Sequence, residues 1–99
     1  MTQSPGDRLE QYTLAHPDEV FLVQAEVAGE PDEVIIFRGF SSSLMQPTAY
    51  DLEVPVLPQG AKIQRVDHLR GPYDPRNPQP IQENLSWPQT HAFLISQGF

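Results

Sequence analysis

Residues 33–43 read Glu-Val-Ile-Ile-Phe-Arg-Gly-Phe-Ser-Ser-Ser, and this stretch decides the fold of the 99-residue chain. It is the densest apolar run in the sequence, and it is rich in the β-branched and aromatic residues that suit a packed, pleated surface. Four apolar residues in a row, Val34 to Phe37, cannot all face water. The pattern therefore predicts a central strand, near residues 33–40, that is buried on both faces and against which the rest of the chain pairs or packs.

Segments on both sides of this run predict a small antiparallel sheet. Residues 20–28 place every second side chain on one apolar face, and the turn around Gly29 joins them to the central strand as a hairpin. Residues 61–69 carry Ile63, Val66 and Leu69 at a spacing of three. This spacing fits neither clean alternation nor a long helix, and it indicates a strand with a β-bulge.

A helix is expected at each end of the chain. Ser4 is a suitable N-cap for a helix over residues 4–15, which Pro17 brings to a stop. Residues 86–89, Ser-Trp-Pro-Gln, have serine and glutamine at the two positions of a capping box, and Gly98 lies where a helix C-cap glycine belongs. The sequence thus predicts a single α+β domain: an antiparallel sheet of three or more strands flanked by an N-terminal and a C-terminal helix.

Proline dominates the rest of the chain. Eleven prolines are about twice the average frequency, and most of them follow Gln46. Large apolar residues interspersed among them favour long ordered loops over the sheet, with disorder as the alternative. Within these loops we expect a short edge segment at 54–56 and a surface loop over 71–80 packed through Tyr73.

Composition limits the classes of function. Thirteen acidic residues against six basic ones give a net charge of −7, which repels the phosphates of nucleic acid and argues against nucleic-acid binding. The chain has no cysteine, so disulfides and thiolate metal sites are excluded. The longest apolar run is far shorter than the roughly 20 residues that span a membrane. The first residues do not resemble a signal peptide, and we expect a soluble cytoplasmic protein.

No motif predicts a catalytic or metal site. Asp67 and His68 are neighbours on a strand, so their side chains point to opposite faces and cannot form the usual pair of a catalytic triad. The three histidines lack metal-binding spacing, and His16 is read as a residue favoured by a helix C-terminus. The acidic residues between 26 and 33 lack the spacing of a calcium loop. We therefore predict no catalytic residues, no metal and no cofactor.

The residues after the central strand allow a different hypothesis. Arg38, Gly39 and the serines Ser41, Ser42 and Ser43 offer a cation, hydroxyls and backbone N–H groups to an anion. The spacing is not that of a nucleotide-binding P-loop, and a capped turn that ends the strand is the alternative reading. A small phosphometabolite-binding protein or enzyme that uses this loop, with His68 nearby, is the second functional hypothesis.

Four segments carry a family resemblance: residues 16–20, 36–44, 56–63 and 70–78. With them the chain resembles a family of small proteins of cyanobacteria and plant chloroplasts, and it is similar to the V subunit of the photosynthetic NDH complex. That complex is the ferredoxin-dependent relative of respiratory complex I. The resemblance implies a non-catalytic accessory or assembly subunit without cofactor, peripheral on the cytoplasmic side of the thylakoid membrane and close to the ferredoxin site.

The basic residues predict how such a partner is met. Four of the six lie on the central strand or on the strand expected beside it, whereas the acidic residues concentrate elsewhere. Pairing of these strands would gather some of the cations on a face that also carries the serine loop. Such a patch would suit an acidic partner such as ferredoxin, with scattered, solvated charge as the alternative. The predicted partner-binding residues are Arg38, Phe40, Ser41, Ser42, Ser43, Lys62, Arg65 and Arg70.

Overall fold

The computed structural model describes residues 5–27, 29–44, 57, 60–71, 74 and 76–99. The expected segment at 54–56, Tyr73 and most of the proline-rich loops lie outside these residues. The chain forms the elements α1 (Pro5–Ala15), β1 (Glu19–Val27), β2 (Glu30–Phe37), β3 (Phe40–Ser43), β4 (Lys62–Arg70), β5 (Pro80–Leu85) and α2 (Trp87–Ser96). The predicted α+β fold, with one helix before the strands in the chain and one after them, is confirmed.

The sheet has five antiparallel strands in the order β3-β2-β1-β4-β5. Its central strand is β1, so the prediction that residues 33–40 form the centre is wrong. The reason is the turn at Arg38 and Gly39, which folds the serines back as β3 instead of ending the sheet there. Because β3 then occupies the outer side of β2, β4 pairs with β1 and not with β2.

The strand β2 is nevertheless buried on both of its faces. Val34 and Ile36 face the helices and are fully buried, and Ile35 on the opposite face is 8% exposed. Phe37 departs from the prediction because it is the last residue before the turn, where 39% of its surface is exposed.

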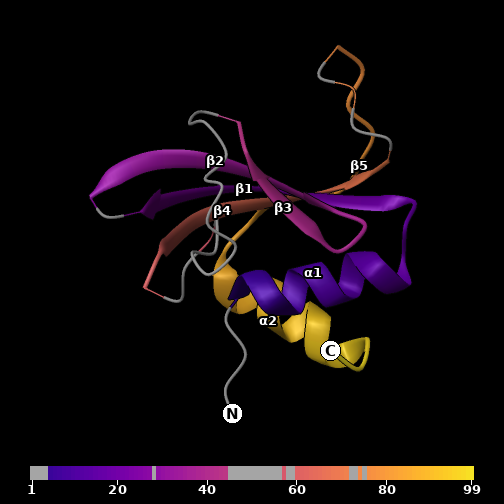
Figure 1. Cartoon of the computed structure of the whole chain (residues 1–99). Helices are drawn as coiled ribbons and strands as arrows, with labels where there is room; N and C mark the ends of the chain where they lie inside the picture. The colour runs from indigo at the N-terminus through magenta and orange to yellow at the C-terminus, as the bar shows by residue number, and fades with distance from the viewer. Residues whose placement is uncertain (1–4, 28, 45–56, 58–59, 72–73, 75) are drawn as a thin grey trace.

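Both helices pack on the same face of the sheet, as Figure 1 shows. α1 contacts β1, β2 and β3, whereas α2 lies against β4 and touches α1. The apolar core between the layers is made by alternate strand residues and by the inner faces of the helices, with Leu57 added from the chain before β4. Its buried members are Leu9, Tyr12, Phe21, Val23, Ala25, Val34, Ile36, Leu57, Val66 and Leu94.

Three short-range signals in the sequence are confirmed, whereas the N-cap expected at Ser4 lies outside the described residues. Ser86 and Gln89 form the capping box: the Gln89 backbone N–H donates to Ser86 Oγ at 3.3 Å, and the Ser86 N–H donates to Gln89 Oε1 at 2.9 Å. Gly98 follows the C-cap of α2 with a φ of +87°. The β-bulge is also present, because Gln24 and Ala25 of β1 pair with Arg65 and Ile63 and skip Gln64.

Candidate functional site

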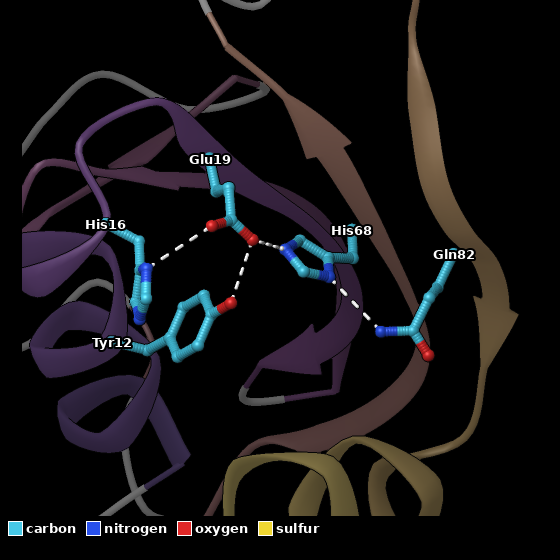
Figure 2. A network of polar contacts seen from close by, with 5 residues as sticks. All are labelled: Tyr12, His16, Glu19, His68 and Gln82. Atoms are coloured by element: carbon cyan, nitrogen blue, oxygen red, sulfur yellow. Dashed lines mark hydrogen bonds and ion pairs between the residues drawn. The ribbon is translucent and has the colours of Figure 1, made fainter. Parts of the chain in front are cut away.

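A partly buried polar network joins α1 to the sheet, and Glu19 is its centre (Figure 2). Glu19 Oε1 accepts hydrogen bonds from Tyr12 Oη at 2.8 Å and from His68 Nε2 at 2.6 Å. Its second oxygen lies 3.4 Å from His16 Nδ1. On the other side of the imidazole, the Gln82 amide nitrogen lies 3.2 Å from His68 Nδ1. The network therefore links α1, β1, β4 and β5.

Burial sets the protonation of this network. His68 is 1% exposed, its ring stacks on Phe21 at 4.6 Å, and desolvation lowers its pKa although Glu19 acts in the opposite direction. The imidazole is thus neutral, with its Nε2–H donating to Glu19 and its Nδ1 accepting from the Gln82 amide. Burial, and then the bond to Glu19, raise the pKa of Tyr12 above its ordinary value of 10.0.

The contacts of this network differ from those of a general-base site. A carboxylate beside an imidazole is also found in general-base catalysis, but there the second ring nitrogen must reach a substrate or a nucleophile. In His68 both ring nitrogens have partners inside the protein, and the ring has almost no contact with solvent. The part of the chain that the structure describes also contains no group of His, Asp and Glu that could hold a metal ion.

The sequence does not predict this network, because its residues are far apart in the chain. Glu19 and His68 are 49 positions apart, and they meet only through the register of β1 and β4, in which Phe21 is opposite His68. The reading of Asp67 and His68 is confirmed: Asp67 does not contact the imidazole, and its carboxylate accepts from Arg65 Nε at 3.2 Å and the Asn84 N–H at 2.9 Å.

Exposed apolar side chains gather at one end of the molecule, which we call the turn end. It comprises the end of α1, residues 16–18, the β2–β3 turn at 38–39, the end of β4 and the start of β5. The register brings these segments together, since Phe37 pairs with Val20, Val20 with Leu69, and Leu69 with Pro80. The large apolar residues exposed here are Leu14 (68%), Phe37 (39%), Phe40 (70%) and Ile81 (44%).

Two hollows lie at the turn end, one on each side of Asp18. The first, of about 360 Å³, has Val20, Ile35 and Phe37 among its apolar lining, and Arg38 also lines it. The second, of about 350 Å³, is lined by Asp18, Glu19, Arg70 and Ile81. Volumes of roughly 300 Å³ and above are typical of sites that receive a ligand or an anchoring side chain.

The turn itself is conformationally unusual. Arg38 has a φ of +49° and Gly39 a φ of +81°, so both central residues are left-handed, as in a type I′ hairpin turn. A Cβ at position 39 would also lie 3.2 Å from Leu14 Cδ1, a contact that the exposed Leu14 side chain would have to relax. Arginine at position 38, unlike glycine, carries the energetic cost of the left-handed conformation. Non-glycine residues in this conformation often occur at functional sites.

The structure separates the predicted basic patch into two parts. Arg38 and Arg70 lie at the turn end, Arg38 in the turn that precedes the exposed Phe40 and Arg70 at the end of β4. Lys62 pairs with Glu26 near the opposite end of the sheet, and Arg65 lies between, bonded to Asp67. Because β1 lies between β2 and β4, the pairing that was expected to gather some of these cations does not occur.

The three serines do not converge either. Ser41 Oγ donates to Glu10 Oε2 and Ser43 Oγ donates to Asp32 Oδ1, each at 2.7 Å, on the side of β3 that faces the helices. Ser42 alternates with them and therefore points to the opposite face. Two of the three hydroxyls are thus engaged by carboxylates, and this arrangement does not favour an anion site built on the serine loop.

Comparison with known proteins places the chain in a family without assigning an activity. No curated protein and no solved structure matches it. No helix in the described ranges is both long and apolar enough to cross a membrane. The model of the family described as "Domain of unknown function (DUF7734)" matches residues 6–94, which is most of the chain, and the protein therefore belongs to that family.

Proposed function

We propose that this protein is a non-catalytic accessory or assembly subunit that docks on a larger complex through its turn end. The observation that carries the proposal is that exposed Phe37 and Ile81 each line one of two hollows at the turn end, on a molecule with a net charge of −7. Exposed Leu14 and Phe40 lie at the same end of the sheet. Exposed apolar groups that cluster on a highly charged protein are typical of interaction surfaces.

The family resemblance supports the same surface. Three of the four segments that carry it, residues 16–20, 36–44 and 70–78, are far apart in the sequence, yet parts of each lie at the turn end. The fourth, residues 56–63, leads into β4 at the opposite end of the sheet. With the resemblance to a subunit of the photosynthetic NDH complex, we propose that complex as the docking site, on its cytoplasmic side near ferredoxin.

The charges of the turn end define the partner surface. Arg38 and Arg70 are exposed, and neither forms a salt bridge with another described residue. A partner that presents apolar side chains beside a carboxylate would fill the first hollow and neutralise Arg38. Charges at the rim of an interface act mainly on the rate of association, so binding should weaken as salt screens them.

The test is a capture experiment with matched charge reversals. The tagged protein is used to retain partners from an extract of cyanobacterial thylakoids, and the retained subunits are identified by mass spectrometry. Arg38→Glu with Arg70→Glu should abolish capture at low salt. Lys62→Glu with Arg65→Glu changes the net charge by the same amount away from the turn end and should leave capture largely intact. Equal capture by both double variants would refute docking through the turn end.

The anion-binding alternative has its own outcome in a simple assay. A bound ligand at 100 times its Kd stabilises the folded state by about 2.7 kcal/mol, which a thermal melt detects. Stabilisation by inorganic phosphate that is lost in Arg38→Glu, together with an absence of captured partners, would favour the alternative over the docking proposal.

A further inference from the structure

The second hollow at the turn end has charges of both signs on its walls. Asp18 and Glu19 contribute carboxylates from the start of β1, and Arg70 contributes a guanidinium from the end of β4. The hollow is open to solvent, because Asp18 and Arg70 are exposed, Ile81 is 44% exposed and the Glu19 side chain is 24% exposed. A dissolved molecule can therefore contact both kinds of charge.

The opposite charges of this hollow are not paired with each other. Glu19 is directly opposite Arg70 in the register of β1 and β4, so the two side chains leave the same face of the sheet. The Cβ atoms of such a pair are about 4.5–5.5 Å apart, which is close enough for a salt bridge. Arg70 nevertheless forms no salt bridge with a described residue, and only its backbone N–H is bonded, to the Gln79 carbonyl at 2.8 Å. The guanidinium is thus available to a ligand.

The Glu19 carboxylate is held toward α1, as Figure 2 shows. Its Oε1 accepts from Tyr12 Oη and His68 Nε2, whereas Oε2 has only a long contact, 3.4 Å, with His16 Nδ1. A carboxylate can accept about four hydrogen bonds, so Glu19 retains capacity for a donor in the hollow. Because its position is already fixed, binding to it costs little side-chain entropy.

The arrangement of charges selects the class of ligand. A simple anion would pair with Arg70 but would be repelled by Asp18 and Glu19. A simple cation would pair with the carboxylates but would be repelled by the guanidinium. A small zwitterion satisfies both walls at once. The volume of about 350 Å³ is at the lower end of the range of ligand sites, about 300–1,000 Å³, and Ile81 adds an apolar contact.

We propose that the second hollow binds a free α-amino acid with an aliphatic side chain. The ammonium group of the ligand lies at Asp18 and Glu19, and its carboxylate accepts the two parallel hydrogen bonds that a guanidinium donates. Its side chain packs on Ile81. Ion pairs at an exposed site contribute little each, so the affinity is expected to be weak. This inference goes beyond the proposed function and does not rest on it.

The first experiment compares three ligands that share one branched carbon chain. The ¹⁵N-labelled protein is titrated at pH 7 with L-leucine, with isopentylamine, which lacks the carboxylate, and with 4-methylpentanoate, which lacks the ammonium group. Shifts of the backbone amide signals of residues 18–19, 70–71 and 81 report binding. L-Leucine should bind about tenfold or more tightly than either analogue, because each analogue loses one charged contact. Equal binding of an analogue, or no saturable shift with L-leucine, would overturn the proposal.

The second experiment removes single charges at exposed side chains. Arg70→Gln and Asp18→Asn each remove one charge of the hollow, and circular dichroism melts first establish that both variants fold. L-Leucine should bind Arg70→Gln about tenfold or more weakly than the natural protein, and Asp18→Asn should also bind it more weakly. The control Arg38→Gln removes the cation that lines the first hollow and should leave leucine binding unchanged. Equal losses in Arg38→Gln and Arg70→Gln would contradict a site in the second hollow.

Two combined outcomes separate this inference from the proposed function. Capture of a complex that requires Arg38 and Arg70, together with no binding of L-leucine, would leave the docking proposal standing and remove the amino-acid site. Binding of L-leucine that requires Arg70 but not Arg38, in a protein that captures no subunit, would support the amino-acid site and remove docking.

Discussion

Replacing Arg38 by asparagine should stabilise the protein and at the same time impair docking. Arg38 occupies the first central position of the type I′ turn with a φ of +49°. For an ordinary L-residue the left-handed conformation costs roughly 1–2 kcal/mol, whereas asparagine tolerates it and Asn-Gly is the preferred pair in this turn. Since asparagine recovers part of this cost, Arg38→Asn should raise the free energy of unfolding by about 1 kcal/mol.

Thermal and urea melts measure this gain. In a domain of this size about 1 kcal/mol corresponds to a rise in Tm of about 4–8 °C. Two control variants isolate the causes: Arg38→Ala removes the guanidinium but keeps the strained conformation, and Arg38→Lys keeps both charge and strain. Neither should be more stable than the natural protein. In the capture assay Arg38→Asn and Arg38→Ala should both associate more slowly at low salt, and Arg38→Lys should lose less.

If Arg38→Asn melts at the same temperature as Arg38→Ala, the turn imposes no conformational cost on arginine. The docking part of the prediction fails if Arg38→Asn binds the partner as fast as the natural protein. If Arg38→Asn is more stable and also binds the partner normally, Arg38 is needed neither for stability nor for docking.

Two other predictions concern the core and the buried network. Ile36→Ala should lower the free energy of unfolding by about 2–5 kcal/mol in urea melts, because the Ile36 side chain is fully buried. The control Phe37→Ala should lower it clearly less, because Phe37 is partly exposed. A decrease below about 1 kcal/mol in Ile36→Ala would contradict the assignment of β2. Folding lowers the pKa of His68 below its ordinary value of 6.5, so between these two pKa values the unfolded chain binds more protons than the folded one. The free energy of unfolding should therefore fall as the pH falls through this range, by at most about 1.4 kcal/mol per pH unit. In melts between pH 7 and pH 5, the free energy of unfolding of His68→Gln should depend less on pH than that of the natural protein. An unchanged pH dependence would show that His68 is not its source.

The features that the sequence predicted correctly are those decided by neighbouring residues. The capping box depends on Ser86 and Gln89, three positions apart, and the helix end on Gly98. The bulge in β4 was visible because one extra residue, Gln64, shifts the apolar spacing from two to three. Such patterns report local backbone geometry, so they need no knowledge of what packs against them.

The predictions that are wrong concern features that depend on contacts between distant segments of the chain. The Arg38-Gly39 pair lacks the asparagine or aspartate that usually marks a type I′ turn, and serine is not among the residues enriched in strands, so nothing local predicts β3. Without β3, the sequence places β2 at the centre of the sheet with β4 as its neighbour. The same missing register concealed the contact between Glu19 and His68, since nothing local to either residue indicates the other.

The buried network has a consequence for the turn end, because the two are adjacent. Glu19 lines the second hollow with its neighbour Asp18, while its carboxylate is held by Tyr12 and His68. The Asp18 carbonyl also accepts from the Gly71 N–H at 2.6 Å, which fixes the segment before β1 against the segment after β4. A surface whose backbone is ordered before binding loses less conformational entropy when it binds. If a partner docks at the turn end as proposed, the carboxylate–imidazole pair would serve docking indirectly, by holding in place a wall of the second hollow.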